Sequence, residues 1–242
     1  MAINKPYKRI FRLMVNGNEE YILDPRYSPD RISFIHSYHL IEKDLKILFD
    51  FISPNCLNNY TFSHRIYELF FRCCTEFENN AKAILISNGY VKSGNFNIAD
   101  DYFKINKALK LNNYKIRLNV WENNPLIITP YAEWSEETYT PLPWYRDYNQ
   151  VKHNRSGNFN LANFKNLITA AAGLMALLYA QYGYHSFSPY QAISMFDDQD
   201  GFESANDSLF EVYPDQSSED DKYDFDWAIL KNSTQPMENF IF

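Results

Sequence analysis

The sequence predicts a mainly α-helical fold: an antiparallel helical bundle with an N-terminal β-hairpin and a small irregular acidic C-terminal extension. Apolar residues recur every three or four positions over residues 28–52, 63–88 and 160–181, which is the period of one buried helix face. Runs typical of β-strands are short and few. We expect the chain to divide into residues 1–27 (hairpin), 28–183 (bundle) and 184–242 (an acidic extension packed on the bundle).

The N-terminal hairpin is expected over residues 7–23. Asn16-Gly17 stands between two runs that are rich in β-forming residues. Both central positions of a type I′ turn need a positive φ, which Asn and Gly adopt readily, so this dipeptide is a strong hairpin signal.

The first two helices have clear end signals. Ser28 is a good N-cap and Pro29 suits the first helical position. The helix over 63–88 stops at Gly89. Its apolar side includes Cys73, which we interpret as filling the core.

The remaining elements follow from shorter patterns. A helix (99–112), a half-exposed strand (115–120), a proline-rich aromatic loop (122–143) and two helices (142–155 and 160–181) are expected in that order.

The last helix and the tail carry three further signals. Alanines 170–172 and Gly173 lack bulk, so a neighbouring helix can approach closely there. In the tail, 208–213 favours a strand and 225–230 a short helix, with the acidic stretch between them as a solvated loop.

Several enzyme classes are excluded by the residues that are missing. The chain has only seven glycines and no GxGxxG motif, and Gly89 to Gly94 is followed by Asn95 rather than the lysine of a P-loop. Neither GxSxG nor HExxH occurs. Dinucleotide folds and P-loop enzymes are therefore not expected.

The sequence also indicates a soluble cytoplasmic protein without a cofactor. Its three cysteines form no CxxC pair, the N-terminus lacks a signal-peptide pattern, and the apolar run 167–180 is shorter than a membrane span. His36, His39 and His64 have no further ligand at metal-binding spacing, so we expect no metal site.

The charge is unevenly distributed. Residues 197–226 hold twelve acidic side chains and one basic one, whereas residues 1–196 hold 21 basic and 17 acidic. Besides a solvated loop, this acidic segment suggests a mimic of nucleic acid that occupies a basic cleft, which would inhibit RNA binding.

The most informative segment is PWYRDYNQVKHNR, residues 143–155. On a helix, Arg146 and His153 are two turns apart and differ by only about 20° around the axis. Asn149 lies beside the line between them, and Trp144 and Tyr148 project from the opposite, buried side. A guanidinium beside an imidazole suits phosphate chemistry, because the first binds phosphate oxygens and the second moves a proton near neutral pH.

Arg146-Asp147-Tyr-Asn-Gln-Val-Lys-His153 resembles the Arg…His motif of the HEPN superfamily. The segments HRIYELFFRCCTEFENNAKAIL (64–85) and NFNLANFKNLITAAAGLMALL (158–178) are also similar to helices of uncharacterised bacterial HEPN-like proteins. The resemblance covers roughly residues 28–183 and leaves out the hairpin and the acidic tail.

This resemblance implies a metal-independent endoribonuclease, as in toxins and phage-defence effectors, that leaves 2′,3′-cyclic phosphate ends. His153 would be the general acid/base at the ribose 2′-hydroxyl, Arg146 would stabilise charge on the phosphate oxygens, and Asp147 or Asn149 would orient the pair. The implied partners are RNA, a second copy of the chain through the bundle, and an antitoxin or regulatory protein.

Two alternatives stay open. The spacing of six residues is at the long limit of the motif, and Tyr-Asn-x-x-Lys-His-x-Arg is the more characteristic core of the similar group, so Arg155 could replace Arg146 as the partner of His153. The segment could also be a structural polar cluster in a non-catalytic binding or regulatory module. Exposure of Arg146 and His153 in a groove would favour the nuclease.

A second basic stretch lies over residues 102–121. Lys104, Lys107 and Lys110 alternate there with aromatic residues and no acid. Together with Lys152 and Arg155, they are the candidate RNA-binding cations, because cations bind phosphates and rings stack on bases. The other interpretation is a solvated helix face above a core of aromatics.

Overall fold

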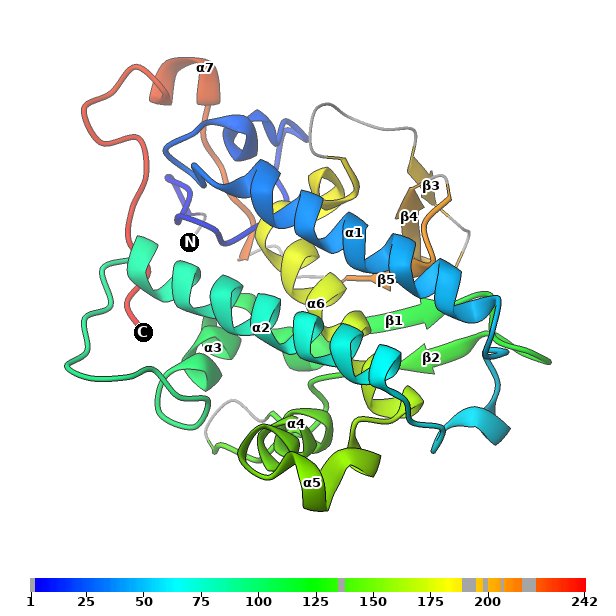
Figure 1. Cartoon of the computed structure of the whole chain (residues 1–242). Coiled ribbons are helices and arrows are strands. Elements are labelled where there is room, and N and C mark those ends of the chain that lie inside the picture. The colour runs from blue at the N-terminus through cyan, green and yellow to red at the C-terminus, as the bar shows by residue number, and fades with distance from the viewer. Residues whose placement is uncertain (1–2, 135–137, 189–194, 198–199, 206, 215–220) are drawn as a thin grey trace.

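Three long helices build the core of the protein, shown in the computed structural model of Figure 1. The structure describes all residues except 1–2, 135–137, 189–194, 198–199, 206 and 215–220. The long helices are α1 (Arg31–Phe49), α2 (His64–Ser87) and α6 (Phe164–Tyr182), and the shorter ones are α3 (Ile105–Leu109), α4 (Pro143–His153), α5 (Arg155–Asn158) and α7 (Trp227–Leu230). The prediction of a mainly α fold is confirmed.

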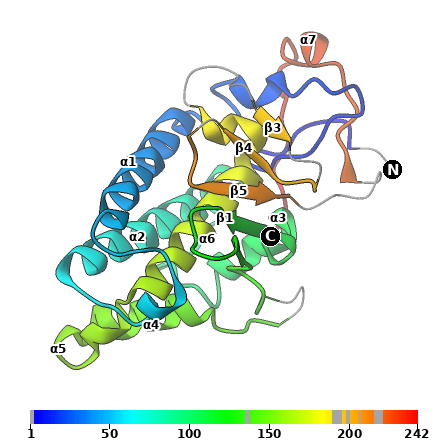
Figure 2. The same cartoon turned by 90° about the vertical axis from the view of Figure 1, so that its right-hand side faces the viewer.

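Helix α6 is the centre of the packing. Every residue of it is buried except Lys165 and Thr169, because α1 and α2 cover one side and the sheet covers the other (Figure 2). The stretch Phe164–Phe187 is long and apolar enough to cross a membrane, but most of it lies buried inside this fold. A Cβ at Gly173 would lie 3.4 Å from the Tyr131 hydroxyl and 3.5 Å from the Trp144 ring, so the lack of a side chain there lets both approach α6 closely.

A five-stranded antiparallel sheet joins the middle of the chain to its C-terminal part. The strand order is β2-β1-β5-β4-β3, with β5 and β2 on either side of β1. The strands are β1 (Lys115–Leu118), β2 (Leu126–Ile128), β3 (Met195–Asp197), β4 (Glu203–Ala205) and β5 (Phe210–Tyr213).

The acidic segment is structured where its residues are described: it contains β4 and β5, and β5 confirms the strand predicted within 208–213. Most of the solvated loop predicted after that strand, residues 215–220, lies outside the described residues. Arg117 on β1 forms ion pairs with Asp200 and Glu211, and its guanidinium lies 4.1 Å from the centre of the Phe202 ring. Glu42 of α1, which is buried, accepts a 2.8 Å hydrogen bond from the Leu209 N–H. These contacts hold the segment on the bundle.

The predicted N-terminal hairpin over 7–23 does not form. Gly17 does turn the chain with φ +69°, but Tyr7 and Met14 pair by isolated bridges with the C-terminal part of the chain, and Glu20–Leu23 is a 3-10 turn. The consecutive residues Ile10 and Phe11 are both buried, which an alternating two-stranded ribbon cannot achieve.

Two predicted helices are shorter than expected, because one residue near the end of each leaves the helical conformation. Within 99–112, a 3-10 turn (Tyr102–Lys104) leads into the short α3, which ends at Lys110 because that residue has a left-handed φ of +49°. The helix over 142–155 ends at His153, since Asn154 adopts an extended φ of −145° and caps α5 by accepting a 3.2 Å hydrogen bond from the Gly157 N–H.

Candidate functional site

Helix α4 has one buried face and one open face. Trp144, Tyr145, Tyr148 and Val151 are buried, and the Trp144 indole donates a 2.9 Å hydrogen bond to the carbonyl of Pro130. This aromatic face fixes the rotation of the helix on α2 and α6. The opposite face is consequently presented to solvent.

The open face forms one wall of a pocket of about 490 Å³. Arg146, Asn149 and His153, three of the four catalytic candidates, line it together. The remaining lining residues are Gln150 of α4, Asn154 and Asn158 beyond its end, and Tyr139, Pro141 and Tyr145.

Asp147 does not line the pocket but holds Arg146 through hydrogen bonds. Its Oδ1 accepts hydrogen bonds from Arg146 Nε and Nη2 at 3.1 and 3.0 Å, and its Oδ2 accepts one from the Asn166 amide of α6 at 2.9 Å. The Asp147 side chain is 15% exposed and that of Arg146 is 58% exposed. The Asn166–Asp147–Arg146 chain therefore holds the guanidinium through Nε and Nη2, and Nη1 has no hydrogen-bond partner among the described residues.

His153 occupies the last position of α4 and is exposed. Its imidazole makes no hydrogen bond or ion pair with any residue that the structure describes. Both ring nitrogens are therefore accessible to a ligand in the pocket, which a proton-transferring group requires.

Lys152, an RNA-binding candidate, lies outside this pocket. Its ammonium is 5.0 Å from the centre of the Tyr148 ring and 3.4 Å from Glu78 of α2. Burial lowers the pKa of Lys152, but Tyr148 and the Glu78 carboxylate outweigh it and raise the pKa overall. Glu78 also accepts a 2.8 Å hydrogen bond from Tyr145, so this cluster attaches α4 to α2.

Arg155, the alternative partner of His153, is also directed elsewhere. Its Nη2 is 2.9 Å from His64 Nδ1, and its guanidinium lies 4.5 Å from the centre of the Tyr67 ring and 5.4 Å from that of Phe159. The break at Asn154 turns Arg155 toward the start of α2. Of the two arginines, Arg146 is the one that shares a pocket with His153.

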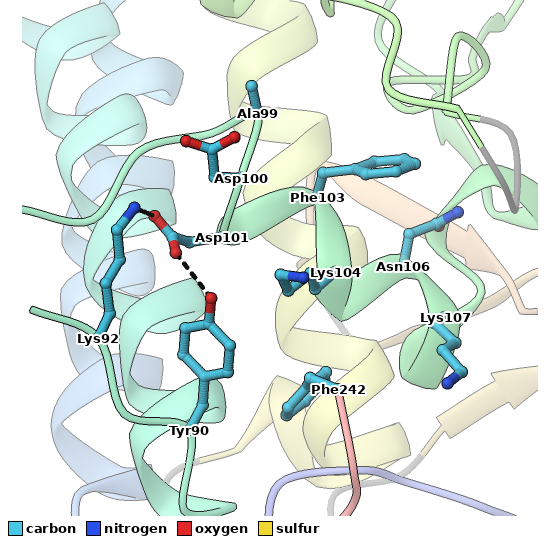
Figure 3. Close-up of a pocket in the computed structure, with 10 residues that line it drawn as sticks. All are labelled: Tyr90, Lys92, Ala99, Asp100, Asp101, Phe103, Lys104, Asn106, Lys107 and Phe242. Atoms are coloured by element: carbon cyan, nitrogen blue, oxygen red, sulfur yellow. Dashed lines mark hydrogen bonds and ion pairs between the residues drawn. The ribbon is translucent and has the colours of Figure 1, made fainter.

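The lysines of the second basic stretch separate into two groups. Lys110 forms an ion pair with Asp221 of the acidic segment. Lys104 and Lys107 line a second pocket, of about 610 Å³, which Figure 3 shows. Its wall also contains Asp101, fully buried, which accepts hydrogen bonds from Lys92 (2.6 Å) and Tyr90 (2.9 Å).

The other reactive side chains are poorly placed for chemistry. Cys73 and Cys74 are buried, and loss of solvation raises the pKa of the Cys73 thiol to about 12, so its nucleophilic thiolate does not form at neutral pH. Among the described residues, no three His, Cys, Asp or Glu side chains lie together as a metal site would need.

Sequence reasoning missed Asn166, Glu78 and His64 as neighbours of the candidate residues. Each belongs to a different helix from the residue that it contacts, so no periodicity within one segment could show these pairs. Comparison of the chain with protein-family models, with curated proteins and with solved structures finds no match.

Proposed function

We propose that the α4 pocket is the active site of a HEPN-type endoribonuclease. The observation that carries this proposal is the common pocket of Arg146, Asn149 and His153, with Asp147 positioning Arg146 from behind. Both Arg146 and His153 are exposed rather than buried inside the bundle. This exposure supports a catalytic role rather than that of a structural polar cluster.

The reaction requires no water or metal in its first step. A base removes the proton of a ribose 2′-hydroxyl, the 2′-oxygen attacks phosphorus, and the bond to the 5′-oxygen breaks as an acid protonates that oxygen. The products are a 2′,3′-cyclic phosphate and a 5′-hydroxyl, and atoms balance without a co-reactant. His153 acts in proton transfer, and Arg146 stabilises the charge that builds on the phosphate oxygens.

A second copy of the chain completes this chemistry. One step needs both a base and an acid, and His153 is the one imidazole among the residues that line the pocket. We therefore infer a homodimer in which two α4 faces meet over one RNA strand. A toxin or phage-defence effector would need an antitoxin or regulatory protein to cover this face.

The test is cleavage of RNA in EDTA by the parent and by His153→Ala. His153→Ala is expected to lower the rate by about 10²–10⁴-fold, while His36→Ala, an exposed histidine of α1, leaves it unchanged. Arg146→Lys should retain charge but lose the donor fork and most activity. If the parent cleaves no RNA, the pocket belongs to a non-catalytic binding or regulatory module instead. Cleavage that survives in His153→Ala would contradict the assignment of His153.

A further inference from the structure

The α4 pocket and the pocket of Lys104 and Lys107 are joined by an aromatic contact. Phe103 lines the pocket of Lys104 and Lys107, and Tyr139 lines the α4 pocket. Their ring centroids are 5.7 Å apart in an edge-to-face arrangement, and both side chains are half-buried. A ligand that leaves the α4 pocket past Tyr139 therefore meets Phe103 at the edge of the second pocket.

The second pocket carries two cations that are not neutralised. Lys104 and Lys107 form no ion pair with any residue in the described part of the chain. Instead, their ammonium groups each lie 5.9 Å from the centre of an aromatic ring, Tyr90 for Lys104 and Phe240 for Lys107. Lys92, by contrast, is bound to Asp101, so the cations available to a ligand are Lys104 and Lys107.

The acidic side chains of this pocket form hydrogen bonds with groups other than those two lysines. Asp101 is satisfied by Lys92, Tyr90 and the Asn97 N–H (2.7 Å). The exposed Asp100 accepts a 2.8 Å hydrogen bond from the Asn97 amide. In Figure 3 both carboxylates are on the side of Lys92, away from Lys107.

The pocket wall also contains an unused donor. Asn106 is 2% exposed, and its Nδ2 has no hydrogen-bond partner among the described residues. Its Oδ1 accepts a 3.1 Å hydrogen bond from the Asn112 N–H, which fixes the orientation of the amide. Because this nitrogen is shielded from solvent, it does not reach a ligand in the pocket, and the groups available to a ligand there are the cations.

We propose that the Lys104–Lys107 pocket holds a nucleotide of the same single-stranded RNA whose cleavage site lies in the α4 pocket. The lysines bind backbone phosphates, and Phe103 stacks on a base as the strand passes from Tyr139. Aromatic faces beside cations bind single strands in preference to duplexes, because paired bases do not expose their faces. This inference rests on the proposed function for the direction of the strand, but the pocket itself can be tested by binding alone.

The experiment measures binding of a fluorescent single-stranded RNA of about 12 nucleotides, a length within the known range of single-strand sites. The His153→Ala background keeps the RNA intact. Lys104→Ala and Lys107→Ala should each lower the slope of log affinity against log salt by about 0.7, and Phe103→Leu should weaken binding about fivefold or more. Lys43→Ala, an exposed lysine of α1, is the matched control.

Two comparisons make the inference falsifiable. If the second pocket acts only on longer strands, Lys104→Ala and Lys107→Ala with His153 intact should cleave a dinucleotide at the same rate as the parent. Unchanged binding of the longer RNA in those variants would overturn the second pocket while leaving the nuclease intact. An equal weakening for duplex RNA would overturn the single-strand assignment. If the parent cleaves nothing yet the lysine variants weaken binding, the proposed function fails and the binding site stands.

Discussion

Gly183, the residue directly after α6, offers a test of how tightly the N-terminal segment packs on the core. A Cβ at Gly183 would lie 2.5 Å from Cζ of the Phe11 ring, and Gly183 has a φ of +56°. Phe11 cannot move away easily, because it is 7% exposed and its N–H donates a 3.0 Å hydrogen bond to Ala180 of α6. Gly183→Ala therefore combines backbone strain with a steric clash.

The two costs can be separated by a matched variant. With φ +56° and ψ −142°, Gly183 lies in a backbone region that is nearly restricted to glycine and costs an alanine about 1–3 kcal/mol. Overpacking costs about 1–3 kcal/mol more, so Gly183→Ala should lose about 2–6 kcal/mol of unfolding free energy. Gly17→Ala also has a positive φ, of +69°, but open space around its Cβ, and should lose only a backbone cost of about 1–2 kcal/mol. Urea unfolding followed by circular dichroism measures both values. Equal losses in the two variants would refute the packing of Phe11 against Gly183.

Three smaller predictions follow from other parts of the fold. Ser63→Ala removes the side chain that accepts the N–H of Ile66 and should lower unfolding free energy by about 1 kcal/mol in urea titrations; no loss would contradict the cap. Tyr131→Phe removes a buried 2.8 Å hydrogen bond to the Gly173 carbonyl and should also lower the unfolding free energy by about 1 kcal/mol. Thermal unfolding measures this loss, and an unchanged midpoint would argue against the contact. Burial and the charge of Arg31 lower the pKa of His185 from 6.5 to about 4, so between these pH values the unfolded chain binds a proton that the folded chain does not, and stability falls as the pH drops from 6.5 toward 4. His185→Gln should therefore make the unfolding free energy depend less on pH over that range. A pH profile identical to that of the parent would contradict this prediction.

Features that depend on neighbouring residues in the sequence, such as helix periodicity and turns, were predictable from the sequence. The apolar period predicted the buried face of α2, whereas α6 is buried almost all round. The predicted Ser28 cap is wrong: α1 begins at Arg31 after Asp30, and the Ser28 hydroxyl lies 3.0 Å from the Tyr182 hydroxyl instead. Ser63, which was not predicted as a cap, caps α2. Asn16-Gly17 also makes its turn, yet the flanking chain pairs with Tyr223 rather than with itself. The partner is distant in sequence, and the burial of both Ile10 and Phe11 decides against a hairpin.

The candidate site shows the same division between local and distant information. Helical geometry alone brings Arg146, Asn149 and His153 to one face of α4. The place of Arg155 could not be predicted in this way, because it depends on Asn154 leaving the helix and on His64 from α2. Pairing between distant segments also determines which acidic residues form ion pairs, such as Asp221 with Lys110 and Glu211 with Arg117.

The most direct measurement of the central claim is the chemical identity of RNA ends made in EDTA by the parent and by His153→Ala. A defined single-stranded RNA is incubated with each protein, and its fragments are weighed by mass spectrometry. We expect 2′,3′-cyclic phosphate and 5′-hydroxyl ends from the parent, and intact RNA with a folded His153→Ala protein. Ends bearing a 5′-phosphate, or the same cyclic ends from both proteins, would contradict it.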